Sequence, residues 1–332
     1  MLSRRILAML IAVVLPCVAA GPSVVRADVA NPTKLTLVAG PVAGTGYIGM
    51  GAVGKEINNL DPQLTITLLP GSDMSNPIRL QNNEVEIAAE TIALGVAAHK
   101  GVAPFKKPVT NVASIANLRT SARMNIVVRA DSGITSIEQI RERKIPLRLA
   151  HGPRGSASEV FGRWVLGEYG IDFKDITKWG GKLYANNFDD VANMLKDGQV
   201  DMLFWGGPGE AWFLTEMATS TELRWLPVSD EVVARLGEKY LMTPVRFEKG
   251  LYRGMIREDI QSAGTAAEIM VRANMSDDLV YKITKALCEG RDSIAMANPT
   301  WDTFIPEKAF EGISYPLHPG AAKYYRERGW MN

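Results

Sequence analysis

Apolar and polar residues alternate along the chain in blocks that predict strands and helices in turn. Residues 34–39 form a predicted buried strand, and a glycine-rich loop then leads into an amphipathic helix that ends near residue 60. Residues 64–69 form a second strand, which a Pro-Gly pair ends, and a short helix over 75–81 follows. An asparagine turn and a third strand over 85–89 complete the unit. This alternation is typical of α/β layers.

The same order of blocks recurs about 112 residues later in the chain. Residues 35–41 match 147–153 through two leucines and a Gly-Pro pair, and a Gly-Thr pair shortly afterwards corresponds to a Gly-Ser pair. A later block, 80–87, matches 195–202 through a leucine, a turn and a strand that starts valine, acid, apolar. Three matches in order at a nearly constant offset predict two lobes of similar topology.

Two such lobes facing each other would place two glycine loops across one cleft. Ligands of open α/β sheets bind beyond the carboxyl ends of the strands. Each loop leads into a helix whose first amides are unpaired and whose dipole favours an anion. We therefore expect a clamp for a small negatively charged ligand, which closes by a hinge between the lobes.

The first glycine loop also matches the G-x-G-x-x-G pattern of dinucleotide sites over residues 44–49. Its context does not fit a dinucleotide, because the next strand ends Leu-Leu-Pro-Gly with no acid to hold a ribose. Two interpretations of Gly44 stay open, which are capping of the following helix and contact with a small ligand.

The second glycine loop carries the only cation in either loop, Arg154. An arginine can hold a carboxylate through two parallel hydrogen bonds, so Arg154 is either a ligand contact or a solvated loop residue. Ser156 in the same loop could act as a nucleophile with His151, but no G-x-S-x-G elbow surrounds it. An exported hydrolase that uses Ser156 is the enzyme alternative.

Glu90 and Thr91 directly follow the predicted strand 85–89, where a ligand contact would lie. The alternative is a capping threonine beside an acid near the helix dipole. Trp205 holds the matching place in the second lobe, either as a cleft wall or as a core residue. If Glu90 and Arg154 face each other, a zwitterion fits with its ammonium at Glu90 and its carboxylate at Arg154. We then expect Arg154→Ala to weaken carboxylate binding by about 2 kcal/mol.

Composition and charge exclude several classes of protein. The 332 residues carry 37 basic and 36 acidic side chains, for a net charge of +1, so a nucleic-acid surface is not expected. Three isolated histidines and two cysteines give no zinc spacing, and no paired carboxylates or catalytic triad stand out. We expect no metal, no cofactor and no catalytic residue, and a monomer because no heptad seam indicates a dimer.

The first 27 residues read as an export signal. Two arginines precede an apolar run over 6–20, which is shorter than the roughly 20 residues of a membrane span. Small residues offer cleavage after Ala20 or after Ala27, while a buried N-terminal helix is the alternative. We expect the mature protein in the periplasm, with Cys288 as its single cysteine, packed in the core.

Several stretches of this chain together resemble one known family. They are residues 44–47, 71–72, 152–156, 197–201, 279–287 and 316–327. In order and spacing the chain is similar to the TAXI-type solute receptors of tripartite ATP-independent periplasmic (TRAP) transporters. The resemblance implies a type II periplasmic-binding fold. It also implies capture of a small organic acid or amino acid, glutamate-like or 2-oxoglutarate-like, and its delivery to a permease driven by an ion gradient.

The resemblance also implies a set of ligand contacts. Loop glycines and pocket side chains fall at Gly44, Thr45, Tyr47, Ser72, Thr91, Gly155, Ser156, Ser158 and Tyr252. The chain departs from the family pattern at Arg154, where the family has proline, and at Glu90, where it often has glutamine. Trp205 also begins a segment that is usually more aliphatic.

The predicted organisation is one discontinuous lobe and one continuous lobe. Lobe one comprises residues 28–124 and 229–332, and lobe two comprises 125–228. The chain would cross between them near 125–128 and again near 224–226. The function expected is ligand capture for a TRAP permease without chemistry. The alternatives are the hydrolase and a ligand-sensing accessory domain of a signalling system.

Overall fold

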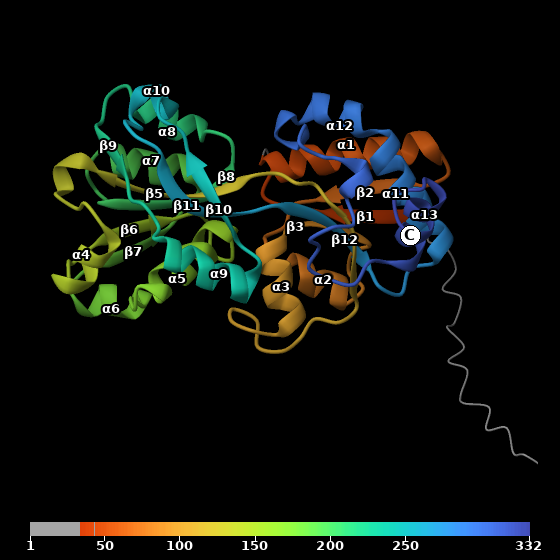
Figure 1. Cartoon of the computed structure of the whole chain (residues 1–332), viewed down its shortest axis with the longest axis horizontal. Coiled ribbons are helices and arrows are strands. Elements are labelled where there is room, and N and C mark those ends of the chain that lie inside the picture. The colour runs from red at the N-terminus through yellow and green to blue at the C-terminus, as the bar shows by residue number, and fades with distance from the viewer. Residues whose placement is uncertain (1–33, 43) are drawn as a thin grey trace, which may run out of the picture.

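The computed structural model describes residues 34–42 and 44–332, so the predicted export signal lies outside the described residues. The described chain folds into two α/β lobes, each built on its own mixed sheet (Figure 1). The strand order is β2-β1-β3-β12-β4 in lobe one and β10-β11-β5-β8-β6-β7 in lobe two, where β9 also pairs with β5. The predicted two-lobed α/β fold is confirmed.

The elements of lobe one come from both ends of the described chain. Its strands are β1 (Lys34–Val38), β2 (Thr65–Leu69), β3 (Ile87–Thr91), β4 (Val112–Asn117) and β12 (Ala267–Arg272). Its helices are α1 (Thr45–Leu60), α2 (Asn76–Gln81), α3 (Ile92–Lys100), α11 (Asp277–Glu289), α12 (Arg291–Ala297) and α13 (Pro319–Glu327). Short 3₁₀ turns occupy Pro299–Trp301 and Pro306–Lys308.

Lobe two is formed by the middle of the chain. Its strands are β5 (Ala122–Arg129), β6 (Arg148–His151), β7 (Lys182–Ala185), β8 (Met202–Pro208), β9 (Leu223–Trp225), β10 (Thr243–Phe247) and β11 (Ile260–Thr265). Its helices are α4 (Ile137–Glu142), α5 (Ala157–Glu168), α6 (Phe173–Lys178), α7 (Phe188–Lys196), α8 (Trp212–Met217), α9 (Asp230–Tyr240) and α10 (Leu251–Gly254). A 3₁₀ turn lies at Ala130–Ser132.

The repeat seen in the sequence corresponds to the same strand arrangement in both lobes. β1 lies between β2 and β3 and is parallel to both, and β6 lies in the same way between β7 and β8. An antiparallel strand then follows in each sheet, β12 beside β3 and β5 beside β8. The loops after β1 and β6 therefore occupy equivalent positions at the carboxyl edges of their sheets.

The chain crosses between the sheets after β4 and returns after β11, not near residues 224–226. Residues 229–265 therefore belong with lobe two, whereas the sequence analysis placed them in lobe one. β11 pairs antiparallel with β5, and Arg235 of α9 binds Glu168 of α5 at 2.7 Å. These long-range contacts lie outside the parallel repeat, so the repeat gave no indication of them.

One apolar cluster runs through both lobes. It joins Leu94 of α3 to Phe161 of α5 and Leu236 of α9, and all three side chains are buried. The indole of Trp164 in α5 donates to the carbonyl of Ala103 in lobe one at 3.3 Å. Two further clusters cover the opposite faces of the two sheets. The lobes therefore share packed apolar surface on the α3, α5 and α9 side.

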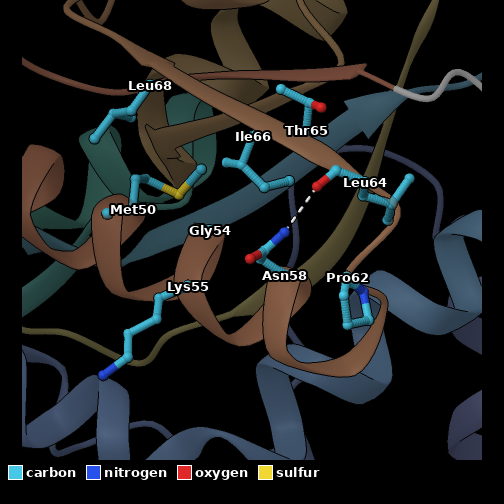
Figure 2. A pocket seen from close by; sticks show the side chains of 10 residues that line it. Met50, Gly54, Lys55, Asn58, Pro62, Leu64, Thr65, Ile66 and Leu68 are labelled. Atoms are coloured by element: carbon cyan, nitrogen blue, oxygen red, sulfur yellow. Dashed lines mark hydrogen bonds between the residues drawn. The ribbon is translucent and has the colours of Figure 1, made fainter.

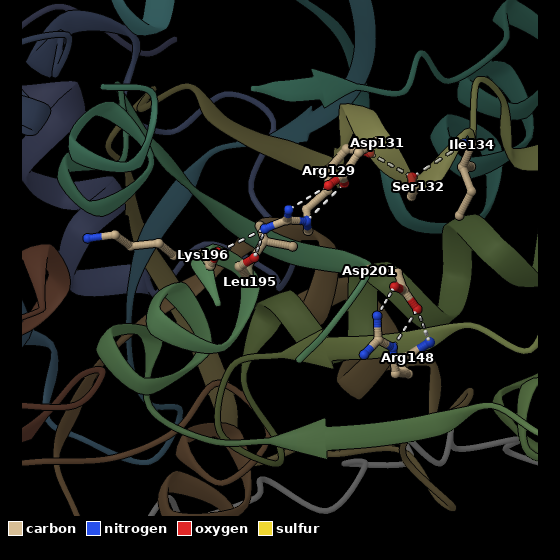
Figure 3. Close-up of polar contacts among 8 residues, drawn as sticks. All are labelled: Arg129, Asp131, Ser132, Ile134, Arg148, Leu195, Lys196 and Asp201. Atoms are coloured by element: carbon tan, nitrogen blue, oxygen red, sulfur yellow. Dashed lines mark hydrogen bonds and ion pairs between the residues drawn. The ribbon is translucent and has the colours of Figure 1, made fainter. Parts of the chain in front are cut away.

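Ion pairs and charged hydrogen bonds hold the edge of lobe two where β6 and β8 begin (Figure 3). Arg148 forms a bidentate pair with Asp201, the residue that precedes β8. Arg129 binds Asp131 and donates to the carbonyls of Leu195 and Lys196 at the end of α7, at 3.1 and 2.8 Å. Cations are favourable at a helix carboxyl end. Because these groups lie where the strands start, they leave the carboxyl edge of the sheet to other residues.

Candidate functional site

Loops of the two lobes meet directly at the carboxyl edges of the sheets. The backbone N–H of Met74 donates to the carbonyl of Gly155 at 3.1 Å. The N–H of Ala157, the first residue of α5, donates to Oδ2 of Asp73 at 2.7 Å. Asp73 and Met74 follow β2, and Gly155 follows β6. The sequence analysis expected the two glycine loops to face each other, whereas the observed contacts join the second glycine loop to the loop after β2.

A buried amide joins the strand ends of lobe one beneath this contact. Nδ2 of Asn76, which is 1 % exposed, donates to the carbonyls of Ala39 and Ala89 at 3.1 Å each. The N–H of Gly71 donates to the carbonyl of Gly40 at 3.2 Å. The loops after β1, β2 and β3 are thereby fixed relative to one another, which is what a preorganised binding edge requires.

The N-terminus of α5 is already occupied by acids of the chain itself. Ser156 caps the helix, because its Oγ accepts from the N–H of Glu159 at 3.4 Å. Oε2 of Glu159 accepts from the N–H of Gly155 at 2.8 Å, and Arg163 pairs with the same carboxylate. Together with Asp73 on Ala157, these bonds fill the position that we expected for a ligand anion.

The N-terminus of α1 is different, because its N-cap residue has no side chain that could cap it. Its N-cap is Gly44 and its first turn holds no acid. The first amides of a helix have no partner within the helix, so the amides that follow Gly44 are open to an anion. Thr45 is exposed and Tyr47 is half-buried beside them. Asn298 fixes this turn by donating to the carbonyl of Thr45 at 2.8 Å.

Glu90 is buried at the end of β3, where the sequence placed it, with 3 % of its surface exposed. Its Oε1 accepts from the N–H and the hydroxyl of Thr91 at 2.7 and 3.2 Å. Its Oε2 accepts no hydrogen bond from an N–H or O–H group among the described residues, although the Asp73 carboxyl lies within hydrogen-bonding reach of the Glu90 carboxyl. Burial raises the pKa of Glu90 well above its ordinary value, and the charges of Asp73 and Glu268 raise it further.

Arg154 is exposed and does not act on Glu90. The groups that do act on Glu90 are acids, and Glu268 lies directly opposite it on the neighbouring strand β12. No hydrogen bond or ion pair joins Glu90 to Arg154 among the described residues, and their pairing across a bound zwitterion stays a prediction. Arg154 directly precedes Gly155, whose φ is +77°, and it is exposed to solvent.

The remaining predicted contacts divide into cleft and support positions. Ser72 faces the second glycine loop, because a Cβ added to Gly155 would lie 3.6 Å from its Oγ. Ser158 is buried and accepts from the N–H of Gly206 at 2.9 Å, which joins α5 to β8. Trp205 packs edge-on against Phe213 on the other face of that sheet.

Tyr252 lies inside lobe two and not on the cleft. It is fully buried, stacks on Trp225 at 4.5 Å, and its hydroxyl donates to Oδ1 of Asn125 at 2.9 Å. The same hydroxyl accepts from the N–H of Ala211 at 3.3 Å. Its hydroxyl is engaged within the lobe, and the ligand role that the resemblance implies for Tyr252 stays a prediction that this position does not support.

Ser156 and His151 are not arranged as a nucleophile and its base. The Ser156 hydroxyl serves the helix cap, and Nδ1 of His151 lies 2.8 Å from the carbonyl of Gly152. The His151 ring is buried and stacks on Phe173, and burial lowers its pKa. No bond between the two side chains supports acyl chemistry in the described part of the chain.

A separate groove lies on lobe one alone, between α1 and the edge strand β2 (Figure 2). Its volume is about 540 Å³, and Asn58 spans one end by donating to the carbonyl of Leu64 at 2.8 Å. Lys55 is the one charged side chain in its lining. The groove does not lie between the lobes, so it is not the cleft that the duplicated topology defines.

The described residues contain neither a metal-binding cluster nor a membrane-spanning helix. Nowhere in 34–42 and 44–332 do three or more histidine, cysteine, aspartate or glutamate side chains gather in a metal-binding arrangement. Within the same residues, each helix is too short or too polar to cross a membrane.

The two-lobed fold is that of periplasmic binding proteins. Three solved structures cover 90 % of this chain at low sequence identity. The periplasmic binding protein BugD is 14 % identical over 95 % of its own chain, with a TM-score of 0.54. MatC from Rhodopseudomonas palustris with bound malate is 12 % identical over 98 %, with a TM-score of 0.53. PhnD1 from Prochlorococcus marinus with methylphosphonate is 12 % identical over 97 %, with a TM-score of 0.52.

Residues 37–329 match the model of the NMT1-like family, and the chain belongs to that family. The match spans both lobes and both crossings between them.

Proposed function

We propose that the protein is an exported receptor that captures a small organic acid or amino acid between its lobes and delivers it to a TRAP permease. The observation that carries this proposal is the contact between equivalent edges of two lobes. Asp73 and Met74 of lobe one bond to Ala157 and Gly155 of lobe two. Such a contact forms and breaks when hinged lobes close and open around a ligand.

The relatives in fold support a small charged ligand. MatC holds malate and PhnD1 holds methylphosphonate, and both are small anions. In this chain the open N-terminus of α1 supplies the amides and the positive dipole end that such an anion needs. Membership of the TAXI subfamily, the TRAP permease as partner and the periplasmic location are inferred from the sequence resemblance and the predicted export signal.

Incubation of the mature chain with small acids tests this function. Malate, methylphosphonate, L-glutamate and 2-oxoglutarate would each be added, and the melting temperature would be followed. A receptor gains about 2.7 kcal/mol of stability at a ligand concentration of 100 times Kd, and it returns the ligand chemically unchanged. Lys55→Ala, in the groove of Figure 2, is the control and should leave the shift unaltered. Conversion of any added acid into a product would contradict the proposal.

A further inference from the structure

Three carboxyl groups lie at the cleft end of lobe one, with Glu90 and Glu268 buried and Asp73 half-buried. Glu90 ends β3, Glu268 lies opposite it on β12, and Asp73 follows β2. Glu268 is satisfied by the Ser114 hydroxyl at 2.8 Å and by the N–H of Ser314 at 3.1 Å. The two charges that raise the pKa of Glu90, those of Asp73 and Glu268, are both negative.

Tyr315 is a second buried side chain near these carboxyls whose polar group lacks a hydrogen-bond partner among the described residues. The hydroxyl of Tyr315 is 3 % exposed and has no hydrogen-bond partner among the described residues. Tyr315 comes from the segment before α13, and its ring meets His99 of α3 edge-on at 4.8 Å. Burial raises the pKa of this hydroxyl, and the charges of Glu268 and Glu90 raise it further, so Tyr315 lies within their field.

Among the described residues, Oε2 of Glu90 meets no N–H or O–H donor and has only the Asp73 carboxyl within reach, and the hydroxyl of Tyr315 has no hydrogen-bond partner. Buried polar groups without partners cost roughly 1–3 kcal/mol each and are uncommon in native proteins. A carboxylate without a cation in such a place is costlier still, so the ligand-free protein keeps a proton at Glu90. A positively charged donor would satisfy Glu90 without that proton.

The open anion position next to Glu90 follows the adjacent strand, β1, and it is not the N-terminus of α5. β1 pairs directly with β3, and Asn76 bonds to the carbonyls at the ends of both strands. The loop after β1 leads into the uncapped N-terminus of α1. The N-terminus of α5 is closed by Asp73 and Glu159. One edge of lobe one therefore offers an anion position beside a cation position.

We propose that Glu90 and Asp73 receive the protonated amine of the solute, while its carboxylate sits at the N-terminus of α1. The solute class is a small amino acid, and the corresponding oxo acid is rejected. This inference rests on the receptor function proposed above. On binding, the O–H bond of Glu90 breaks, its proton passes to solvent, and the carboxylate pairs with the ammonium. Asp73 keeps its bond to the Ala157 amide and so links occupancy of the site to contact between the lobes.

Matched pairs of solutes test the amine directly on the unmodified mature chain. The pairs are L-glutamate with 2-oxoglutarate, L-alanine with pyruvate, and L-leucine with 4-methyl-2-oxopentanoate. Calorimetric titration in two buffers of different ionisation enthalpy gives the affinity and the number of protons released. We expect at least one amino acid to bind at least tenfold more tightly than its oxo partner, with net proton release near neutral pH.

Substitutions of Glu90 and Asp73 test whether these two carboxyls produce the preference for an amino acid over its oxo acid. Glu90→Gln keeps the size of the side chain, and it should weaken the preferred amino acid at least tenfold and abolish proton release. Asp73→Asn should also reduce the preference for the amine. Glu238→Gln, on the exposed face of α9, should change neither property.

The outcomes separate this inference from the receptor function itself. Binding of an oxo acid as tightly as its amino acid would overturn the amine site but leave the receptor function standing. Amine-selective binding that survives Glu90→Gln and Asp73→Asn would also overturn it. No binding of any amino acid, oxo acid, malate or methylphosphonate would overturn both proposals.

Discussion

The carboxylate of Asp73 accepts a hydrogen bond from the backbone N–H of Ala157 at 2.7 Å, so a side chain of one lobe lies on the first turn of a helix of the other. This bond brings a carboxylate to a position that the helix dipole makes favourable. It also fixes the distance between the loops after β2 and β6. The contact thus couples the arrangement of the lobes to the residues around Glu90.

Ala157→Pro removes this bond without disturbing the helix. Ala157 is the first residue of α5, where proline is well tolerated, and Ser156 before it already has the extended backbone that precedes proline. We expect the free energy of unfolding to fall by about 1–2 kcal/mol. In a double-mutant cycle, Asp73→Ala and Ala157→Pro should be coupled by about 1 kcal/mol or more. Ala157→Gly, which keeps the N–H, is the control, and additive effects would mean that the bond is absent in solution.

Glu90→Gln should change how stability depends on pH. The folded chain holds a proton at Glu90 that the unfolded chain releases above its ordinary pKa of 4.5. The free energy of unfolding of the wild type therefore falls as pH rises from there through the raised pKa. Glutamine does not titrate, so the variant should gain stability relative to the wild type between about pH 5 and about pH 8. Urea unfolding at about pH 5 and about pH 8 measures the difference in the free energy of unfolding between the variant and the wild type. If that difference is the same at both pH values, Glu90 is ionised in the folded protein.

Arg154→Ala should have little effect on ligand affinity. The Arg154 side chain is exposed. The charges that act on Glu90, the partner expected from the sequence, are those of Asp73 and Glu268. We expect a change of less than about 0.5 kcal/mol, as for other solvated surface residues. Calorimetric titration with the best-binding amino acid checks this. A loss of about 2 kcal/mol or more would instead place the guanidinium on the ligand carboxylate.

Two glycines of α5 should respond oppositely to alanine. A Cβ at Gly162 would lie 2.2 Å from the ring of Phe204, so Gly162→Ala forces α5 away from β8. We expect it to lower the free energy of unfolding by about 1–3 kcal/mol. Gly167, on the exposed side of the same helix, has nothing within 4 Å of its added Cβ. Gly167→Ala should raise stability by roughly 0.5–1 kcal/mol, because alanine is the better helix former. Thermal or urea unfolding of the two variants measures both changes in stability. Equal changes in Gly162→Ala and Gly167→Ala would contradict the packing of α5 on β8.

The duplicated part of the fold could be predicted because its signals are local. Strand, glycine loop and helix follow one another within short stretches, and their repetition reveals the second lobe. The return of the chain to lobe one could not be placed in this way. β10 and β11 join lobe two by antiparallel pairing, which depends on partners far away in the sequence.

The residues of the candidate site also differ in whether local sequence signals could reveal them. Glu90 was found because it directly follows a predicted strand, and Ser72 because the stretch 71–72 resembles the family pattern. Asp73 follows Ser72 in the same loop, so its position gave a usable signal that the analysis did not take up. Glu268 and Tyr315 reach the site only through the pairing of β12 and the packing of the segment before α13. Tyr252 is fully buried, which a short sequence motif does not reveal.

The distance between the lobes tests the central claim most directly. Spin labels at Asp189→Cys on α7 and Met296→Cys on α12 would report it, because both positions are exposed and lie on different lobes. The distance distribution would be measured with and without a mixture of the common L-amino acids, using the corresponding oxo acids as the control. The account predicts that amino acids shift the distribution to a single shorter distance and that oxo acids do not. A distribution that no amino acid changes would contradict a receptor that closes its two lobes on an amine-bearing solute.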